Sequence, residues 1–101
     1  FDKNKKLIGL RIKGDSMIDD SIEDGDVIII DCSKNNAYKP KQGDMVVARL
    51  DEDSATLKRI YIKGNKIELR PSNNKYSSII TVKNNVIIEG KVVGLIRSFL
   101  N

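Results

Sequence analysis

Histidine is absent from the sequence, and this absence limits the nucleophilic chemistry that the chain could perform. A Ser-His-Asp triad and a Cys-His dyad both need an imidazole base, so both are excluded. A serine hydroxyl activated by a neutral lysine amine is a known alternative. Ser16 and Lys58 are the pair whose surroundings favour that chemistry.

Ser16 lies in the turn-like segment Lys13-Gly14-Asp15-Ser16-Met17, which follows an apolar stretch. Gly14 allows the backbone to turn tightly, so the amides of Asp15 and Ser16 can point at one spot, as a developing oxyanion requires. The competing interpretation is structural: Asp15 or Ser16 could cap a short helical turn at residues 17–21.

Lys58 lies in a segment, Thr56 to Ile62, that reads as a strand. Alternate side chains of a strand share a face, so Lys58 is expected beside Ile60 and opposite Arg59. If that face is buried, desolvation disfavours the ammonium and lowers its pKa, which would let the amine accept the serine proton. The alternative is a lysine whose stem packs while its amine reaches water.

The pattern predicts an all-β domain of short, mostly antiparallel strands with a barrel-like shape. The expected strands are residues 8–13, 27–30 (covered on both faces), 44–50, 56–62, 66–70 and 86–97, the last as one long strand or two. Polar connections are expected at 35–42, 51–54, 63–65 and 71–78, with 35–42 and 71–78 the mobile ones. In the last strand four apolar residues share one parity with Gly90 and Gly94, which indicate bulges or close backbone approach.

With 101 residues, 40% hydrophobic and 32% charged, the sequence predicts one globular domain spanning residues 1–101. Its one cysteine, Cys32, permits no intrachain disulfide and favours a cytoplasmic setting. The net charge of +4 is mild and aromatic residues are few, so we expect a solvated surface rather than a nucleic-acid interface. We expect no metal, no cofactor, and no membrane-spanning segment, since no apolar run is long enough.

Six short blocks follow one another in a distinctive order along nearly the whole sequence. They are Gly14-Asp15-Ser16-Met17, Ile22-Glu23-Asp24-Gly25-Asp26, Gly43-Asp44-Met45-Val46-Val47-Ala48, Thr56-Leu57-Lys58-Arg59, Glu68-Leu69-Arg70-Pro71-Ser72-Asn73 and Glu89-Gly90-Lys91-Val92-Val93-Gly94-Leu95-Ile96-Arg97. With these blocks the chain resembles the C-terminal peptidase domain of LexA-type repressors, a family that includes UmuD-like proteins and lambdoid phage repressors.

The resemblance implies that Ser16 is the nucleophile, that Lys58 is the general base, and that the backbone amides of Asp15 and Ser16 form the oxyanion hole. It implies a fold of the LexA and signal-peptidase type, and a homodimer formed through the C-terminal strand region. Members cleave their own chain at an Ala-Gly or Cys-Gly bond, stimulated by the RecA–single-stranded DNA filament. That cleavage separates a DNA-binding domain, which contacts operator DNA, from the dimerising domain.

The sequence holds no Ala-Gly or Cys-Gly pair, and 15 residues precede Ser16. We therefore expect the cleavage segment and the N-terminal DNA-binding domain to be absent from this chain. The leading hypothesis is a Ser-Lys autoproteolytic domain of a transcriptional repressor of the SOS or prophage type. The alternatives are a dimerisation module without catalytic activity and a catalytic domain like that of signal peptidase I.

Overall fold

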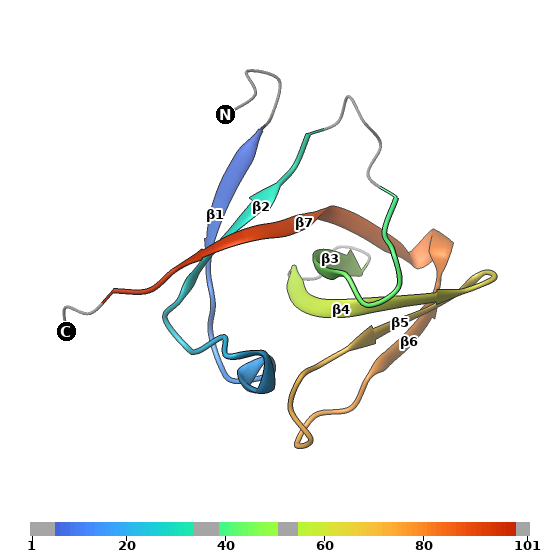
Figure 1. Ribbon diagram of the computed structural model, residues 1–101. Coiled ribbons are helices and arrows are strands. Elements are labelled where there is room, and N and C mark those ends of the chain that lie inside the picture. Colours follow the sequence, from blue (N-terminus) through green and yellow to red (C-terminus); the bar gives the residue numbers. More distant parts are fainter. Residues whose placement is uncertain (1–5, 34–38, 51–54, 99–101) are drawn as a thin grey trace.

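Seven antiparallel strands form one sheet in the computed structural model, which describes residues 6–33, 39–50 and 55–98 (Figure 1). They are β1 (Leu7–Arg11), β2 (Val27–Asp31), β3 (Met45–Leu50), β4 (Thr56–Lys63), β5 (Lys66–Arg70), β6 (Ile79–Val82) and β7 (Val86–Ile96). The order across the sheet is β1-β2-β7-β3-β4-β5-β6, with every adjacent pair antiparallel. The all-β prediction is therefore confirmed.

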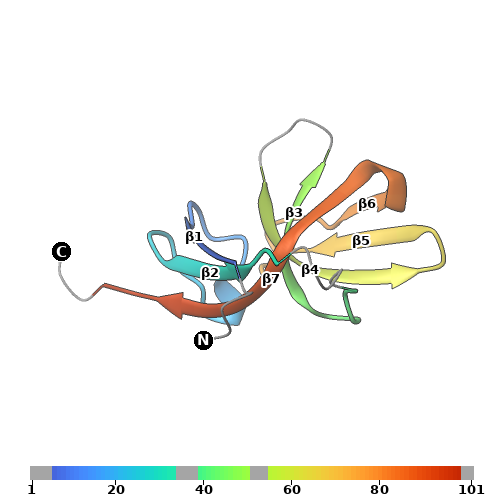
Figure 2. The same cartoon turned by 90° about the horizontal axis from the view of Figure 1, so that it is seen from above.

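The long strand β7 joins the two halves of the sheet. Its C-terminal part pairs with β2 and its N-terminal part pairs with β3. Figure 2 shows β1 and β2 on one side of β7, and the fan of β3 to β6 on the other. Strand β7 pairs with both β2 and β3, and β3 pairs with β4. The turn after β1 and the strand β4 thereby come to lie in the same region of the molecule.

Two bulges in β7 change the face that its side chains present. Register shifts fall opposite the steps Val47/Ala48 of β3 and Ile29/Ile30 of β2, close to the two glycines of the strand. At Gly90 a Cβ atom would lie 2.5 Å from the Asp31 carbonyl oxygen, so only glycine permits this approach. The predicted bulges are confirmed, but they also place Ile96 at 59% exposure, away from the face that Val92 packs on.

The core consists of two clusters on opposite faces of the β3–β4 pair. The first is built from Met17, Ile22, Ile28, Ile30, Val47 and Leu57, and the second from Val46, Ala48, Ile60, Ile67 and Leu69. Val46 and Val47 are adjacent in β3 yet belong to different clusters, because successive strand residues point to opposite faces. Strand β4 is therefore covered on both sides along its middle.

The structure adds one strand and revises another. No strand is expected at β6, although Ile79-Ile80-Thr81-Val82 is a run of β-branched residues that favours one. β2 is expected to be covered on both faces, but only Ile28 and Ile30 are fully buried, and Val27 and Ile29 are half-buried. The predicted connection at 51–54 lies outside the described residues.

Candidate active site

The turn that carries Ser16 follows β1 and is held from one side by the connection that leads into β2. The N–H of Ile12 donates to the carbonyl oxygen of Asp26, and the N–H of Gly25 donates to that of Ile12. The N–H of Gly14 donates to the Asp24 carboxylate at 2.7 Å. Gly14 has a φ of 86°, which favours glycine and sends the chain into the turn.

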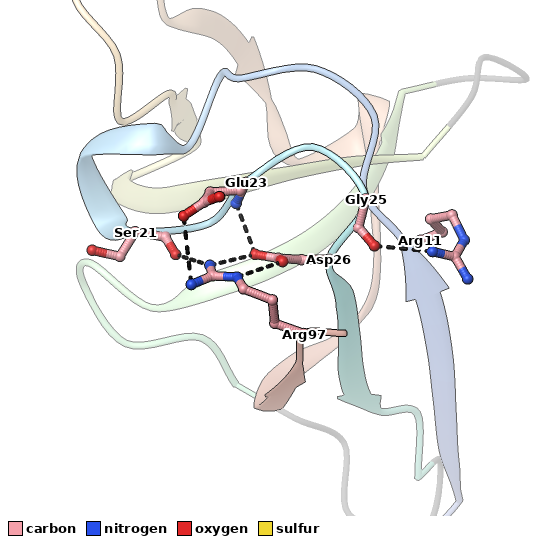
Figure 3. A network of polar contacts seen from close by, with 6 residues as sticks. All are labelled: Arg11, Ser21, Glu23, Gly25, Asp26 and Arg97. Carbon is pink, nitrogen blue, oxygen red and sulfur yellow. Dashed lines mark hydrogen bonds and ion pairs between the residues drawn. The ribbon is translucent and has the colours of Figure 1, made fainter. Parts of the chain in front are cut away.

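Arg97, directly after β7, secures that connection (Figure 3). Its guanidinium donates twice to the carboxylate of Asp26, at 2.8 and 2.7 Å, and also to the carbonyl oxygen of Ser21. Asp26 is 2% exposed and accepts the N–H of Glu23 as well. These hydrogen bonds, with that to Arg97 the strongest, lower the pKa of the Asp26 carboxyl to about 2.

From the other side, the connection between β5 and β6 is hydrogen-bonded to the same turn. The N–H of Ser72 donates to the carbonyl oxygen of Ser16 at 2.8 Å, and the N–H of Asp19 donates to that of Ser72. The hydroxyl of Ser72 donates to Asp20, whose carboxylate also accepts two hydrogen bonds from Arg59 of β4. The turn is thus joined to both β4 and the β5–β6 connection.

The side chains of Ser16 and Lys58 meet at the centre of this region. Lys58 Nζ lies 3.2 Å from Ser16 Oγ, 42 residues away in sequence. The same nitrogen donates to Thr56 Oγ1 at 2.7 Å and to the carbonyl oxygen of Leu57 at 3.0 Å. Contact with Thr56 places the two side chains on one face of β4, as strand alternation predicts.

Lys58 is buried, with 9% of its surface exposed, and its hydrogen-bond partners are uncharged. Burial lowers the pKa of the Lys58 ammonium below its ordinary value of 10.5. The cause is desolvation, because a charged amine loses more hydration free energy on burial than a neutral one. This is the direction that a general base requires.

The partners of Lys58 also suit a neutral amine. A neutral amine has two N–H groups and one lone pair. The Leu57 carbonyl accepts only, and the Thr56 hydroxyl can accept the second N–H. The lone pair is then directed at the remaining neighbour, Ser16 Oγ, from which it could take a proton.

The backbone amides of Asp15 and Ser16 are available as donors. Neither N–H donates a hydrogen bond to any residue that the structure describes. An N–H pair beside a serine hydroxyl is the arrangement that stabilises the oxyanion of an acyl-transfer intermediate. The structure therefore brings Ser16 and Lys58 together, with the amides of Asp15 and Ser16 in the same turn.

Comparison with known proteins identifies the family of the chain. Residues 1–93 match the family described as Peptidase S24-like. The chain belongs to this family. It is also 39% identical over 98 residues to the LexA repressor of Herpetosiphon aurantiacus. That match covers 96% of this chain and 44% of the relative, so the chain spans less than half the length of the repressor it resembles.

One interpretation of this Peptidase S24-like chain is corrected by the structure. The short 3₁₀ helix Ile18–Asp20 has no side-chain cap from Asp15 or Ser16. The reason is that Ser16 Oγ faces Lys58, while the Asp15 carboxylate accepts the Tyr76 hydroxyl at 2.6 Å. Arg59, on the face of β4 opposite Lys58, is paired with Asp20.

Met17 and Cys32 belong to the packing of the core rather than to the site. Met17, next to Ser16 in the turn, is 2% exposed and belongs to the first core cluster. Cys32 packs against the same cluster, and burial raises the pKa of its thiol, which disfavours a nucleophilic role.

Residues 71–78 are expected to form a mobile connection, yet they supply the contacts of Ser72 to the site. The sequence does not reveal this involvement, because a polar Asn- and Ser-rich segment reads only as a loop.

Within the described ranges, no group of three acidic, cysteine or histidine side chains is arranged to hold a metal ion. No helix in those ranges is long and apolar enough to cross a membrane.

Proposed function

We propose that this chain is the autoproteolytic and dimerising domain of a LexA-type transcriptional repressor, with Ser16 as nucleophile and Lys58 as general base. The observation that carries the proposal is the distance of 3.2 Å between Ser16 Oγ and the buried amine of Lys58. Membership of the Peptidase S24-like family and the likeness to a LexA repressor support the same chemistry.

The reaction would proceed by acyl transfer. Neutral Lys58 takes the proton of Ser16 as Oγ attacks the carbonyl carbon of the scissile peptide bond. The carbonyl oxygen becomes an oxyanion that accepts hydrogen bonds from the N–H groups of Asp15 and Ser16. Protonated Lys58 then donates its proton to the leaving amine, and a serine ester remains. Water, deprotonated by Lys58, hydrolyses this ester and regenerates the hydroxyl.

Dimerisation is proposed through the outer face of β1, β2 and the C-terminal part of β7. Leu7, Val93 and Ile96 are 37%, 52% and 59% exposed there. Ile29 lies between Gly9 and Gly94 in the register, so its side chain has no bulky neighbour in the adjacent strands. An apolar surface of this kind at a sheet end is typical of an isologous contact between two copies. Residues 99–101, at the end of the C-terminal strand region, lie outside the described residues.

In the complete repressor, a separate N-terminal domain would contact operator DNA, and the RecA–single-stranded DNA filament would stimulate cleavage. Cleavage would separate the DNA-binding part from the dimerising domain and so weaken operator binding, since two linked half-site contacts bind more tightly than one. The site as described would act in the cytoplasm without a cofactor.

The proposal is tested by extending the chain at its N-terminus with a segment that contains an Ala-Gly bond and incubating it at rising pH. We expect cleavage at that bond, faster as Lys58 loses its proton, and no cleavage in Ser16→Ala or Lys58→Ala. Urea unfolding of each variant shows that the fold is retained. Cleavage that persists in Lys58→Ala would exclude the dyad, and no cleavage at any pH in the extended chain with Ser16 and Lys58 intact would favour a dimerisation module without catalytic activity.

A further inference from the structure

The connection between β5 and β6 donates hydrogen bonds to the backbone of the turn that carries Ser16. Asn73, in this connection, donates from Nδ2 to the carbonyl oxygen of Asp15 at 2.8 Å. That oxygen also accepts the N–H of Ile18, at 3.1 Å, and the shorter of the two bonds is the one from Asn73. The Asp15 carbonyl is thereby held by a side chain 58 residues away in sequence.

The orientation of the Asn73 amide is determined by its two partners. Its Oδ1 accepts the N–H of Lys75 at 2.9 Å, which fixes the oxygen on the side of the connection. A backbone N–H can only donate and a backbone carbonyl can only accept, so Nδ2 must be the atom that faces Asp15. The amide is therefore held in place by a turn within its own segment and directed at the turn that carries Ser16.

The carbonyl that Asn73 holds belongs to the same peptide unit as the N–H of Ser16. A trans peptide is planar, so its C=O and N–H point in opposite directions and turn together. With the Asp15 oxygen directed at Asn73, the N–H of Ser16 is directed away from it, and it donates to no residue that the structure describes. The next peptide unit is held too, because the carbonyl of Ser16 accepts the N–H of Ser72.

We propose that Asn73 is a positioning residue: its side-chain amide fixes the Asp15–Ser16 peptide unit so that the N–H of Ser16 faces the oxyanion. This inference rests on the proposed function, because it assigns Asn73 a part in the same acyl transfer. Without Asn73 the peptide unit would keep only the longer bond from Ile18, and rotation of the unit would turn the N–H away from the reacting oxygen. Fixed donors lower the barrier because they need no reorganisation when the charge forms.

The test measures kcat and KM of the 101-residue chain for a synthetic peptide that contains an Ala-Gly bond. Asn73→Asp keeps the size of the side chain and the acceptor for Lys75, but it removes the donor to Asp15. Asn73→Ala removes the donor without adding charge. For both variants we expect kcat to fall about 10- to 100-fold with KM little changed, as for a misplaced oxyanion donor. The pH dependence of kcat should stay that of the unmodified chain, since Lys58 is untouched.

Tyr76→Phe is the matched control. The Tyr76 hydroxyl donates to the side chain of Asp15, not to its backbone, so its loss leaves the peptide unit held. We expect its kcat to stay within about twofold of the unmodified chain. Unfolding by urea establishes that each variant remains folded at the assay temperature.

Two results would overturn the inference, and they are distinguishable. If the unmodified chain cleaves the peptide but folded Asn73→Asp and Asn73→Ala keep its kcat, Asn73 does not position the peptide unit while the dyad stands. Variants that raise KM alone would exclude the positioning role in the same way. If the unmodified chain cleaves no Ala-Gly bond, the proposed function fails and the role of Asn73 fails with it.

Discussion

The hydroxyl of Thr56 lies 2.7 Å from the amine nitrogen of Lys58, closer than the hydroxyl of Ser16 at 3.2 Å. Thr56 and Lys58 both belong to β4 and share one face, so this contact is built into the strand itself. This contact orients the amine of Lys58. When Lys58 is neutral, the Thr56 hydroxyl and the Leu57 carbonyl accept hydrogen bonds from its two N–H groups, and the lone pair is left to face Ser16.

Replacing Thr56 by valine should therefore slow cleavage, because the isosteric side chain cannot accept the N–H. One hydrogen bond contributes about 0.5–1.5 kcal/mol, which corresponds to a rate loss of about 2- to 10-fold. Single-turnover cleavage rates measure the effect, and Thr56→Ser, which keeps the hydroxyl, is the control. Equal rates for Thr56→Val and the unmodified chain would mean that Thr56 does not orient the amine.

The depressed pKa of Lys58 predicts how stability depends on pH. Below its pKa in the folded chain, Lys58 carries a poorly solvated charge that costs stability. Between that pKa and the ordinary value of 10.5 the unfolded chain binds more protons, so stability rises with pH. Lys58→Met lacks this group, so its unfolding free energy should not rise with pH for this reason. The unmodified chain should therefore gain stability relative to Lys58→Met as pH increases.

Urea unfolding at a series of pH values measures that difference. Ser16→Ala keeps the lysine and should keep the pH dependence of the unmodified chain. Parallel curves for Lys58→Met and the unmodified chain would show that the amine is not desolvated.

Two glycines of β7 form a matched pair for a test of the bulged strand. A Cβ at Gly90 would lie 2.5 Å from the Asp31 carbonyl oxygen, whereas at Gly94 the nearest atoms are at 3.7 Å. Gly90→Ala must displace backbone and should lower the unfolding free energy by about 1–3 kcal/mol. Gly94→Ala meets only ordinary contacts and should change it by less. Equal effects in urea unfolding would contradict the close approach of β7 to β2.

Acid should weaken the contact that secures the connection before β2. The pKa of Asp26 is lowered from 3.8 to about 2 by its bonds with Arg97 and Glu23. The stability it contributes is complete above 3.8 and is lost as pH falls toward 2. Asp26→Asn should therefore be less stable than the unmodified chain at pH 7, and the two should converge in acid. A difference that stays constant down to pH 2 would argue against the ionic contact with Arg97.

Much of the fold could be predicted from alternation and β-branched runs alone. The segment from Lys66 to Arg70 has the predicted bounds, and β4 is one residue longer than predicted. The glycines of β7 indicated bulges, but the pattern could not show that Ile96 turns outward, because a bulge resets the alternation on which the prediction of its face depends.

For the site, residue type and family blocks indicated Ser16 and Lys58, but they could not show which segments position them. The contacts of Asn73 and Ser72 join residues more than 50 positions apart. Such contacts depend on how β5, β6 and the turn after β1 meet in space, which no local pattern records. Short polar residues in a loop give the same sequence signal whether they face solvent or hold a backbone carbonyl.

Activation of Ser16 by the buried amine of Lys58 is best tested by the rate of self-cleavage as a function of pH. With the Ala-Gly segment attached, we predict a rate that rises with pH in a single titration and levels off above the pKa of Lys58, which lies below 10.5. We predict no cleavage in Lys58→Ala at any pH. A rate independent of pH, or cleavage that survives in Lys58→Ala, would contradict the assignment of Lys58 as the base.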